Sequence, residues 1–191
     1  FQVEDTRDGG ISVTAPAINL EGATISTIDT ATAGAVSLTG AVQLRNNISI
    51  STDAATTDNS VTITGAVNAD NATTADRTLT VAAGTGTVRF TSTIGTTQAL
   101  ADLDITAATI RFGGNVSVDD VASAGTVTLT GAVQLDANVS FDVDGTTADH
   151  NLTITGAVDA DANTSNRTLS VTAGTGAIDF QSAIGTTQAL Q

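Results

Sequence analysis

The chain has 191 residues and a formal net charge of −14 at pH 7, from 20 acidic and 6 basic side chains. This charge argues against a nucleic-acid partner, because phosphate binding needs a basic stripe and an acidic surface repels it. The absence of cysteine excludes a disulfide framework and a thiolate metal site, and no apolar run approaches the roughly 20 residues that span a bilayer.

The composition favours strands and turns over helices. Apolar side chains are almost all Ala, Val, Ile and Leu, aromatic residues are scarce, and Thr, Ser, Gly, Asn and Asp fill the positions between them. Val and Thr lose side-chain freedom in a helix, whereas Gly, Asn and Asp favour turns. We therefore expect an all-β chain.

A first type of predicted strand, beginning at 11–14, alternates an apolar residue, a small polar one, an apolar one and usually threonine. Strict alternation is typical of a strand with one buried face. The pattern recurs at 36–39, 61–64, 79–82, 103–106, 127–130, 152–155 and 169–172. Spacings of about 17 to 25 residues predict that these segments are equivalent strands of successive coils, stacked on one another.

A second strand is predicted after a short turn, at 17–20, 41–44, 87–90, 109–112, 132–135 and 177–180. A third, more variable stretch follows at 47–50, 115–118 and 138–141, and it shrinks in two coils to 68–76 and to the segment from Asp159. Two or three short strands in every ~23 residues, with like residues recurring coil after coil, indicate a parallel β-helix.

Longer segments recur at a spacing of about 91 residues. Thr-Gly-Ala-Val-Gln-Leu occurs at 39–44 and 130–135, and Ile-Gly-Thr-Thr-Gln-Ala-Leu occurs at 94–100 and 184–190. We predict one continuous right-handed parallel β-helix (β-solenoid) over 1–191, with about eight coils of about 23 residues. Residues 1–10 end a preceding coil, and the two long repeats cover about 11–102 and 103–191. The alternative, two tandem immunoglobulin-like sandwiches, needs fewer and longer strands than the sequence contains.

These recurring strings, together with Arg-Thr-Leu-Thr-Val-Ala-Ala-Gly-Thr-Gly at 77–86, carry a resemblance that covers the chain from Ile11 onward. They resemble the repeats of very large secreted bacterial surface proteins, the filamentous-haemagglutinin-like and β-strand-repeat adhesins. The resemblance implies a β-helical fibre outside the cell that mediates adhesion or matrix formation, with no catalysis. Its partners would be glycans or proteins of a host or neighbouring cell surface.

Both ends of the sequence match the middle of a coil. Phe1-Gln2 matches Phe180-Gln181, and Leu190 matches Leu100, which leads into another first strand. An isolated solenoid needs polar caps, and uncapped strands are open edges that invite pairing. We therefore expect either a segment of a longer array or an extracellular filament subunit that stacks end to end on itself.

The outward threonines of the first strand offer a possible binding ladder. If the eight segments stack, Thr14, Thr39, Thr64, Thr106, Thr130, Thr155 and Thr172 form one row. Such a row resembles the surface of β-helical ice-binding proteins, so ice or carbohydrate binding is a hypothesis from another functional class. The alternative is that threonine favours strands and that Thr–Thr pairs stabilise a solvated face, because Ala82 and Asp104 interrupt the row.

Acidic turns offer oxygen ligands of the kind that Ca²⁺ accepts, and they are the only cofactor candidates. The carboxylates are Asp142, Asp144 and Asp149 in one turn, Asp70 in another, and Asp159 and Asp161 in a third. No complete EF-hand or nonapeptide calcium pattern is present, and Asp is also a common turn residue.

Arg89 and Arg111 are predicted neighbours on the second strand, with Asp179 at the matching position of the other repeat. A polysaccharide lyase or hydrolase could use such a face. The chain, however, has no lysine and only one histidine, His150, in a variable turn, so we expect a solvated face instead.

Seven Asn-x-Ser/Thr sequons are present, but strand starts of the form Asn-apolar-Ser/Thr produce the same pattern. They lie at Asn47, Asn71, Asn115, Asn138, Asn151, Asn163 and Asn166.

Overall fold

A computed structural model describes residues 9–28, 31–71, 77–119, 125–162 and 167–191. The predicted coil end at 1–8 and the sequons at Asn163 and Asn166 lie outside these residues. The strands are β1 (Ile11–Leu20), β2 (Thr24–Ser26), β3 (Val36–Leu44), β4 (Ile48–Ser51), β5 (Val61–Ile63), β6 (Val67–Ala69), β7 (Thr78–Phe90), β8 (Asp102–Phe112), β9 (Val116–Ser117), β10 (Thr126–Leu135), β11 (Val139–Asp142), β12 (Asn151–Ile154), β13 (Val158–Ala160), β14 (Leu169–Thr172) and β15 (Ile178–Phe180).

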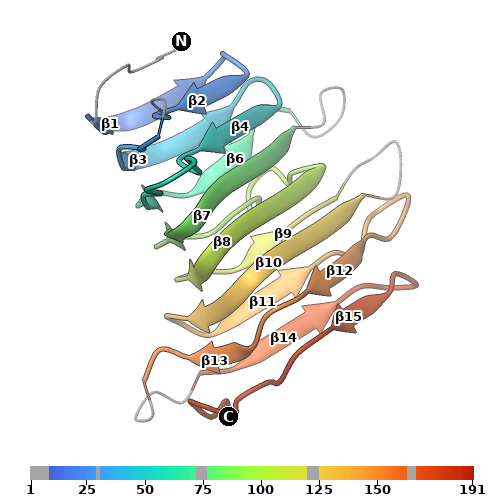
Figure 1. Cartoon of the computed structure of the whole chain (residues 1–191). Helices are drawn as coiled ribbons and strands as arrows, with labels where there is room; N and C mark the ends of the chain where they lie inside the picture. Colours follow the sequence, from blue (N-terminus) through green and yellow to red (C-terminus); the bar gives the residue numbers. More distant parts are fainter. Residues whose placement is uncertain (1–8, 29–30, 72–76, 120–124, 163–166) are drawn as a thin grey trace.

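All pairings between these strands are parallel. The strands stack in chain order, from β1 at the N-terminal end to β15 at the C-terminal end (Figure 1). This confirms the predicted all-β parallel solenoid. The sandwich alternative is wrong, because a sandwich is built from antiparallel strands.

The strand register stacks the apolar side chains of the interior into columns along the axis, and one such column can be followed behind each of the three faces of the solenoid. The first column contains Ile11, Val36, Val61, Val88, Ile110, Val133 and Val158. The second contains Ile18, Val42, Val67, Ile94, Val116, Phe141 and Val171. The third contains Ile25, Ile50, Val81, Ile105, Leu129, Ile154 and Phe180.

The predicted stacking of all eight alternating segments is wrong. Val61 pairs with Val88, whereas Leu79 lies between Ile48 and Leu103. The two short steps, from 61 to 79 and from 152 to 169, therefore advance by two faces and not by a full turn. Because every turn needs three sides to enclose its core, the solenoid has about six turns and not eight.

The long repeat does not contain a whole number of turns. Val36 lies in the first column and its repeat equivalent, Val127, lies in the third; Val42 lies in the second column and its equivalent, Val133, lies in the first. Three full turns and two further faces separate each pair. The second repeat therefore has the same local structure as the first but is rotated by one face about the solenoid axis.

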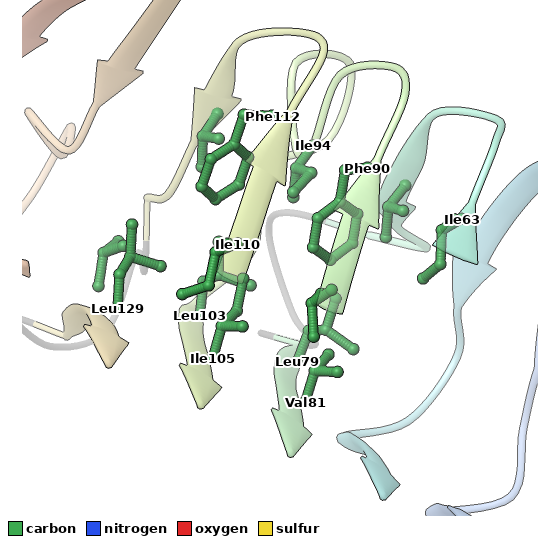
Figure 2. Packing of buried hydrophobic residues seen from close by; sticks show 14 of the residues in the cluster. Ile63, Leu79, Val81, Phe90, Ile94, Leu103, Ile105, Ile110, Phe112 and Leu129 are labelled. Atoms are coloured by element: carbon green, nitrogen blue, oxygen red, sulfur yellow. The ribbon is translucent and has the colours of Figure 1, made fainter. Parts of the chain in front are cut away.

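Aromatic side chains fill the middle of the core. Phe90 and Phe112 lie on neighbouring strands with ring centroids 5.9 Å apart and nearly parallel, and Phe112 meets Phe141 edge to face at 5.2 Å. Figure 2 shows Phe90 and Phe112 beside each other in this packing. All three rings are at most 1% exposed.

Glycine is required at one equivalent corner in each repeat. Gly40 and Gly131 both have φ of 135°, in a region that L side chains rarely adopt. A Cβ there would lie 1.7 Å from the carbonyl oxygen of Ala15 or 1.8 Å from that of Ala107, in the turn below. The corners thus allow the close approach of successive turns.

Truncation of the central ring tests the column packing. We expect Phe112→Ala to lower the free energy of unfolding by about 3–5 kcal/mol, because it removes a buried ring between two others. Phe180→Ala is the matched control and should cost less, because Phe180 is only partly buried at the C-terminal end. Urea denaturation followed by circular dichroism measures both, and equal losses would contradict a core built from stacked columns.

Candidate functional site

The predicted threonine ladder does not form one row. Thr14 and Thr39 are neighbours on the first face, Thr106 and Thr130 on the third, and Thr172 lies on the second beside Asp142. Thr64 follows β5 on the first face, and Thr155 follows β12 on the third. The prediction of a single ladder is therefore wrong, because the rotation of the second repeat moves its threonines to another face.

The acidic turn at 142–149 has a counterpart at 53–58. Asp149 accepts hydrogen bonds from the backbone N–H and the hydroxyl of Thr175, both at 2.5 Å. Asp58 accepts the equivalent bonds from Thr85, at 2.7 and 2.9 Å, and a third from the N–H of Ala54. Asp58 was not among the predicted site residues, although the repeat spacing makes it the equivalent of Asp149. Each carboxylate thus binds a threonine in the next turn of the solenoid and so connects two successive turns.

Asp144 and Asp149 affect each other. The hydrogen bond between the two carboxyl groups raises the pKa of Asp144, and the hydrogen bonds from Thr175 hold the pKa of Asp149 below its usual range. Asp142, at the end of β11, lies close enough for its charge also to raise the pKa of Asp144. Asp144 and Asp149 therefore contact each other, whereas Asp142 acts on the Asp144 carboxyl only through its charge.

The other predicted calcium ligands already have protein partners. Asp70 forms a two-pronged ion pair with Arg77, at 2.8 and 3.0 Å, and Asp161 forms the equivalent pair with Arg167, at 2.9 and 3.0 Å. Asp159 accepts hydrogen bonds from the backbone N–H groups of residues 187 and 188. These carboxylates stabilise corners of the solenoid through their ion pairs and hydrogen bonds.

Within the described ranges, no three His, Cys, Asp or Glu side chains are grouped so that they could hold a metal ion. Calcium binding therefore stays a prediction, for the turn at 142–149 as for the other acidic turns.

Arg89 and Arg111 are neighbours on β7 and β8, as predicted. Asp136, which was not among the predicted site residues, bonds to both: the distance to Arg89 is 3.0 Å and the shortest distance to Arg111 is 2.6 Å. Asp179 lies elsewhere, beside Thr153 on β12. The two arginines are therefore already neutralised in part by a protein carboxylate.

His150 lies in the turn before β12, where the sequence placed it, and its side chain is fully buried. Its Nδ1 lies 3.1 Å from the carbonyl oxygen of Ala148, and its backbone N–H donates to Val143. The bond to Val143 closes the loop between these two residues. The equivalent loop of the first repeat is closed in the same way, by the backbone N–H of Asn59 donating to the carbonyl oxygen of Thr52.

Four of the sequon asparagines accept hydrogen bonds from backbone N–H groups of the following turn. The side-chain oxygens of Asn47, Asn115, Asn138 and Asn151 accept hydrogen bonds from the N–H groups of Thr78, Ser140, Thr168 and Ala177, respectively. Stacking of corners thus accounts for the recurrence of Asn at strand starts.

Apolar side chains lie at both ends of the described stack. At the N-terminal end, Ile11, Val13, Ile18 and Leu20 contribute to an apolar hollow of about 290 Å³. At the C-terminal end, Ile178 and Ile184 are each 44% exposed. Their equivalents in the first repeat, Val88 and Ile94, are fully buried.

Comparisons of the chain with protein-family models, curated proteins and solved structures find no match. No described segment forms a helix that could cross a membrane.

Two carboxyl substitutions with opposite effects test the electrostatics of the corners. Asp102 accepts hydrogen bonds from Leu103 and Thr126, but burial and the charge of Asp104 raise its pKa. Asp102→Asn keeps an acceptor oxygen and removes the disfavoured charge. We expect a higher thermal midpoint at pH 7, and a difference from the native chain that disappears once Asp102 is protonated in acid.

Asp58→Asn is the contrasting variant. Hydrogen bonds from Thr85 lower the pKa of Asp58, so its stabilisation is present above its ordinary pKa of 3.8 and is lost as the pH falls through the folded-state value. We expect a lower midpoint than the native chain at pH 7 and convergence at acid pH. Thermal unfolding between pH 2 and 8 measures both variants; shifts of the same sign at pH 7 would contradict these assignments.

Proposed function

We propose that this chain is a non-catalytic structural segment of an extracellular fibre of the bacterial surface-adhesin type. The observation that carries the proposal is the uninterrupted stacking across the boundary between the two long repeats. β7 of the first repeat pairs with β8 of the second over both of their faces. Addition of repeats therefore lengthens the solenoid without a new kind of contact.

The surface chemistry supports a scaffold role. Many polar side chains at the corners bond to the next turn, as Asp149, Asn47 and Asn138 do. The net charge of −14 keeps such a long exposed object soluble. The resemblance of the repeats to those of secreted surface proteins supports a location outside the cell.

The arrangement of the charged groups gives little support to an enzyme. The arginine pair that would bind an acidic substrate is bonded to Asp136, and His150 is fully buried. General acid–base catalysis needs a group within hydrogen-bond reach of the substrate proton.

Immunogold electron microscopy of cells that produce the protein tests this function. Antibodies against the folded chain should label narrow fibres of uniform width outside the cell, because each turn has the same three-sided cross-section. Preimmune serum is the control. Label confined to the cell interior, or to compact particles, would contradict the proposal.

A further inference from the structure

We propose that a groove on the second face of the solenoid binds a neutral glycan. The inference rests on the proposed adhesin-type function and adds a binding site and the class of its ligand. The groove has a volume of about 280 Å³ and crosses β1, β3 and β6, which are neighbouring strands of this face (Figure 1). Thr97 and Gln98, in the loop one turn beyond β6, also line it.

Small alanines beside longer amide side chains form the groove. Ala17 lies next to Ala41 on the neighbouring strand, and Asn19 lies next to Gln43. Asn68 continues the row of amides on β6. Because alternate residues of a strand point to the same side, the alanines and the amides all point away from the core. The result is a low apolar strip beside amide groups that recur at the strand spacing of about 4.8 Å.

Protein contacts orient two of these amides and leave their N–H donors unused. The Oε1 of Gln43 accepts a hydrogen bond from Nε of Arg45 at 3.2 Å. The Oδ1 of Asn68 accepts two hydrogen bonds, at 3.0 and 3.2 Å, from the backbone N–H groups of residues 97–98. Within the described part of the chain, the two amide nitrogens and the side chain of Asn19 have no hydrogen-bond partner. The groove therefore presents hydrogen-bond donors on neighbouring strands.

This combination matches the chemistry of a sugar. The amide N–H groups would donate to hydroxyl and ether oxygens, and the oxygen of Asn19 would accept from a hydroxyl. The C–H face of a sugar ring would lie on the alanines, as apolar lining with a few placed polar groups is typical of small-molecule sites. None of the described residues that line the groove is charged, and the net charge of −14 disfavours an acidic polymer.

The position of the groove argues against a peptide ligand. An extended peptide commonly binds by adding a strand to an open sheet edge. The groove instead lies over the face of a sheet in which β3 pairs with β1 on one side and with β6 on the other. No main-chain groups of β3 are therefore left within the groove for such a strand.

The second repeat provides an internal comparison. Its equivalents of Asn19 and Asn68 are Arg111 and Asp159, which are charged. Asp159 accepts the same two backbone hydrogen bonds from its loop, at 2.9 and 3.1 Å, but a carboxylate has no N–H group to offer. Arg111 is bonded to Asp136. The second repeat thus has the same local backbone without the neutral donors, so we expect the first repeat to bind the glycan and the second not to.

Titration followed by proton–nitrogen correlation NMR tests the ligand class, because side-chain amide groups give their own signals. The probes are two neutral oligosaccharides, cellohexaose and mannohexaose, with hexagalacturonate and a neutral Gly-Ser-Thr peptide for comparison. At least one neutral oligosaccharide should shift the side-chain signals of Gln43 and Asn68. The absence of a shift with both neutral sugars, or tighter binding of the acidic sugar or of the peptide, would overturn the inference.

Asn68→Asp tests the donor row. The fold accepts this change, because Asp159 holds the equivalent loop through the same bonds. The variant loses an N–H donor and places a charge in the groove, so affinity for the sugar should fall roughly tenfold or more. Asn138→Asp is the control: its side-chain oxygen also accepts a backbone hydrogen bond, from Thr168, outside the groove. Equal affinities of the two variants would contradict the site.

Ala41→Leu tests the location by filling the hollow. Ala41 is exposed on the groove floor, and Ala132 is its exposed equivalent in the second repeat. Ala41→Leu should abolish the shifts, whereas Ala132→Leu should leave them unchanged. Equal effects of the two substitutions would overturn the assignment to the first repeat. None of these outcomes affects the immunogold test, since the fibre depends on the stacking of turns and not on this groove.

Discussion

Each turn of this solenoid buries its apolar side chains only because another turn lies on either side of it. The interior columns run along the axis, and no separate layer of helices or strands within the described ranges covers them. Main-chain hydrogen bonds act in the same direction, since each strand pairs with the strands one turn before and after it. Stability is therefore a sum of contacts between neighbouring turns. Val88, which has paired strands on both sides, is fully buried, whereas its equivalent Ile178, which pairs with Leu152 on one side among the described strands, is 44% exposed.

Polar side chains also form their hydrogen bonds between successive turns, along the solenoid axis. Side chains at the corners satisfy the N–H groups of the next turn, as Asp58 does for Thr85 and Asn138 does for Thr168. The ion pairs of Asp70 with Arg77 and of Asp161 with Arg167 recur at equivalent corners. Residues that resemble ligands or sequons in the sequence thus have partners that the stacking provides. A polar motif in a solenoid is informative about function only after these partners have been accounted for.

The long repeat is not a whole number of turns, and this mismatch determines on which face of the solenoid each repeated residue lies. A repeat of three turns and two faces presents each of its features on a new face in the next repeat. Thr39 and its equivalent Thr130 accordingly lie on different faces. Along a longer array, a given loop would project in three directions in turn. The same mismatch sets the rotation between any two units that continue the stack.

The alternating segments, the Gly-rich corners and the repeat spacing were sufficient to predict a parallel β-solenoid, because a period of two residues and a recurrent coil length are local properties of the sequence. The neighbours Arg89 and Arg111 were also predictable, since both follow the same pattern. The face on which each segment lies was not predictable. Val61 and Leu79 belong to nearly identical motifs, yet they lie on different faces, because loop lengths and the packing of a three-sided core decide where the chain turns. Only the tertiary structure could therefore divide the threonines among three faces, bury His150, and bring Asp136 to the two arginines.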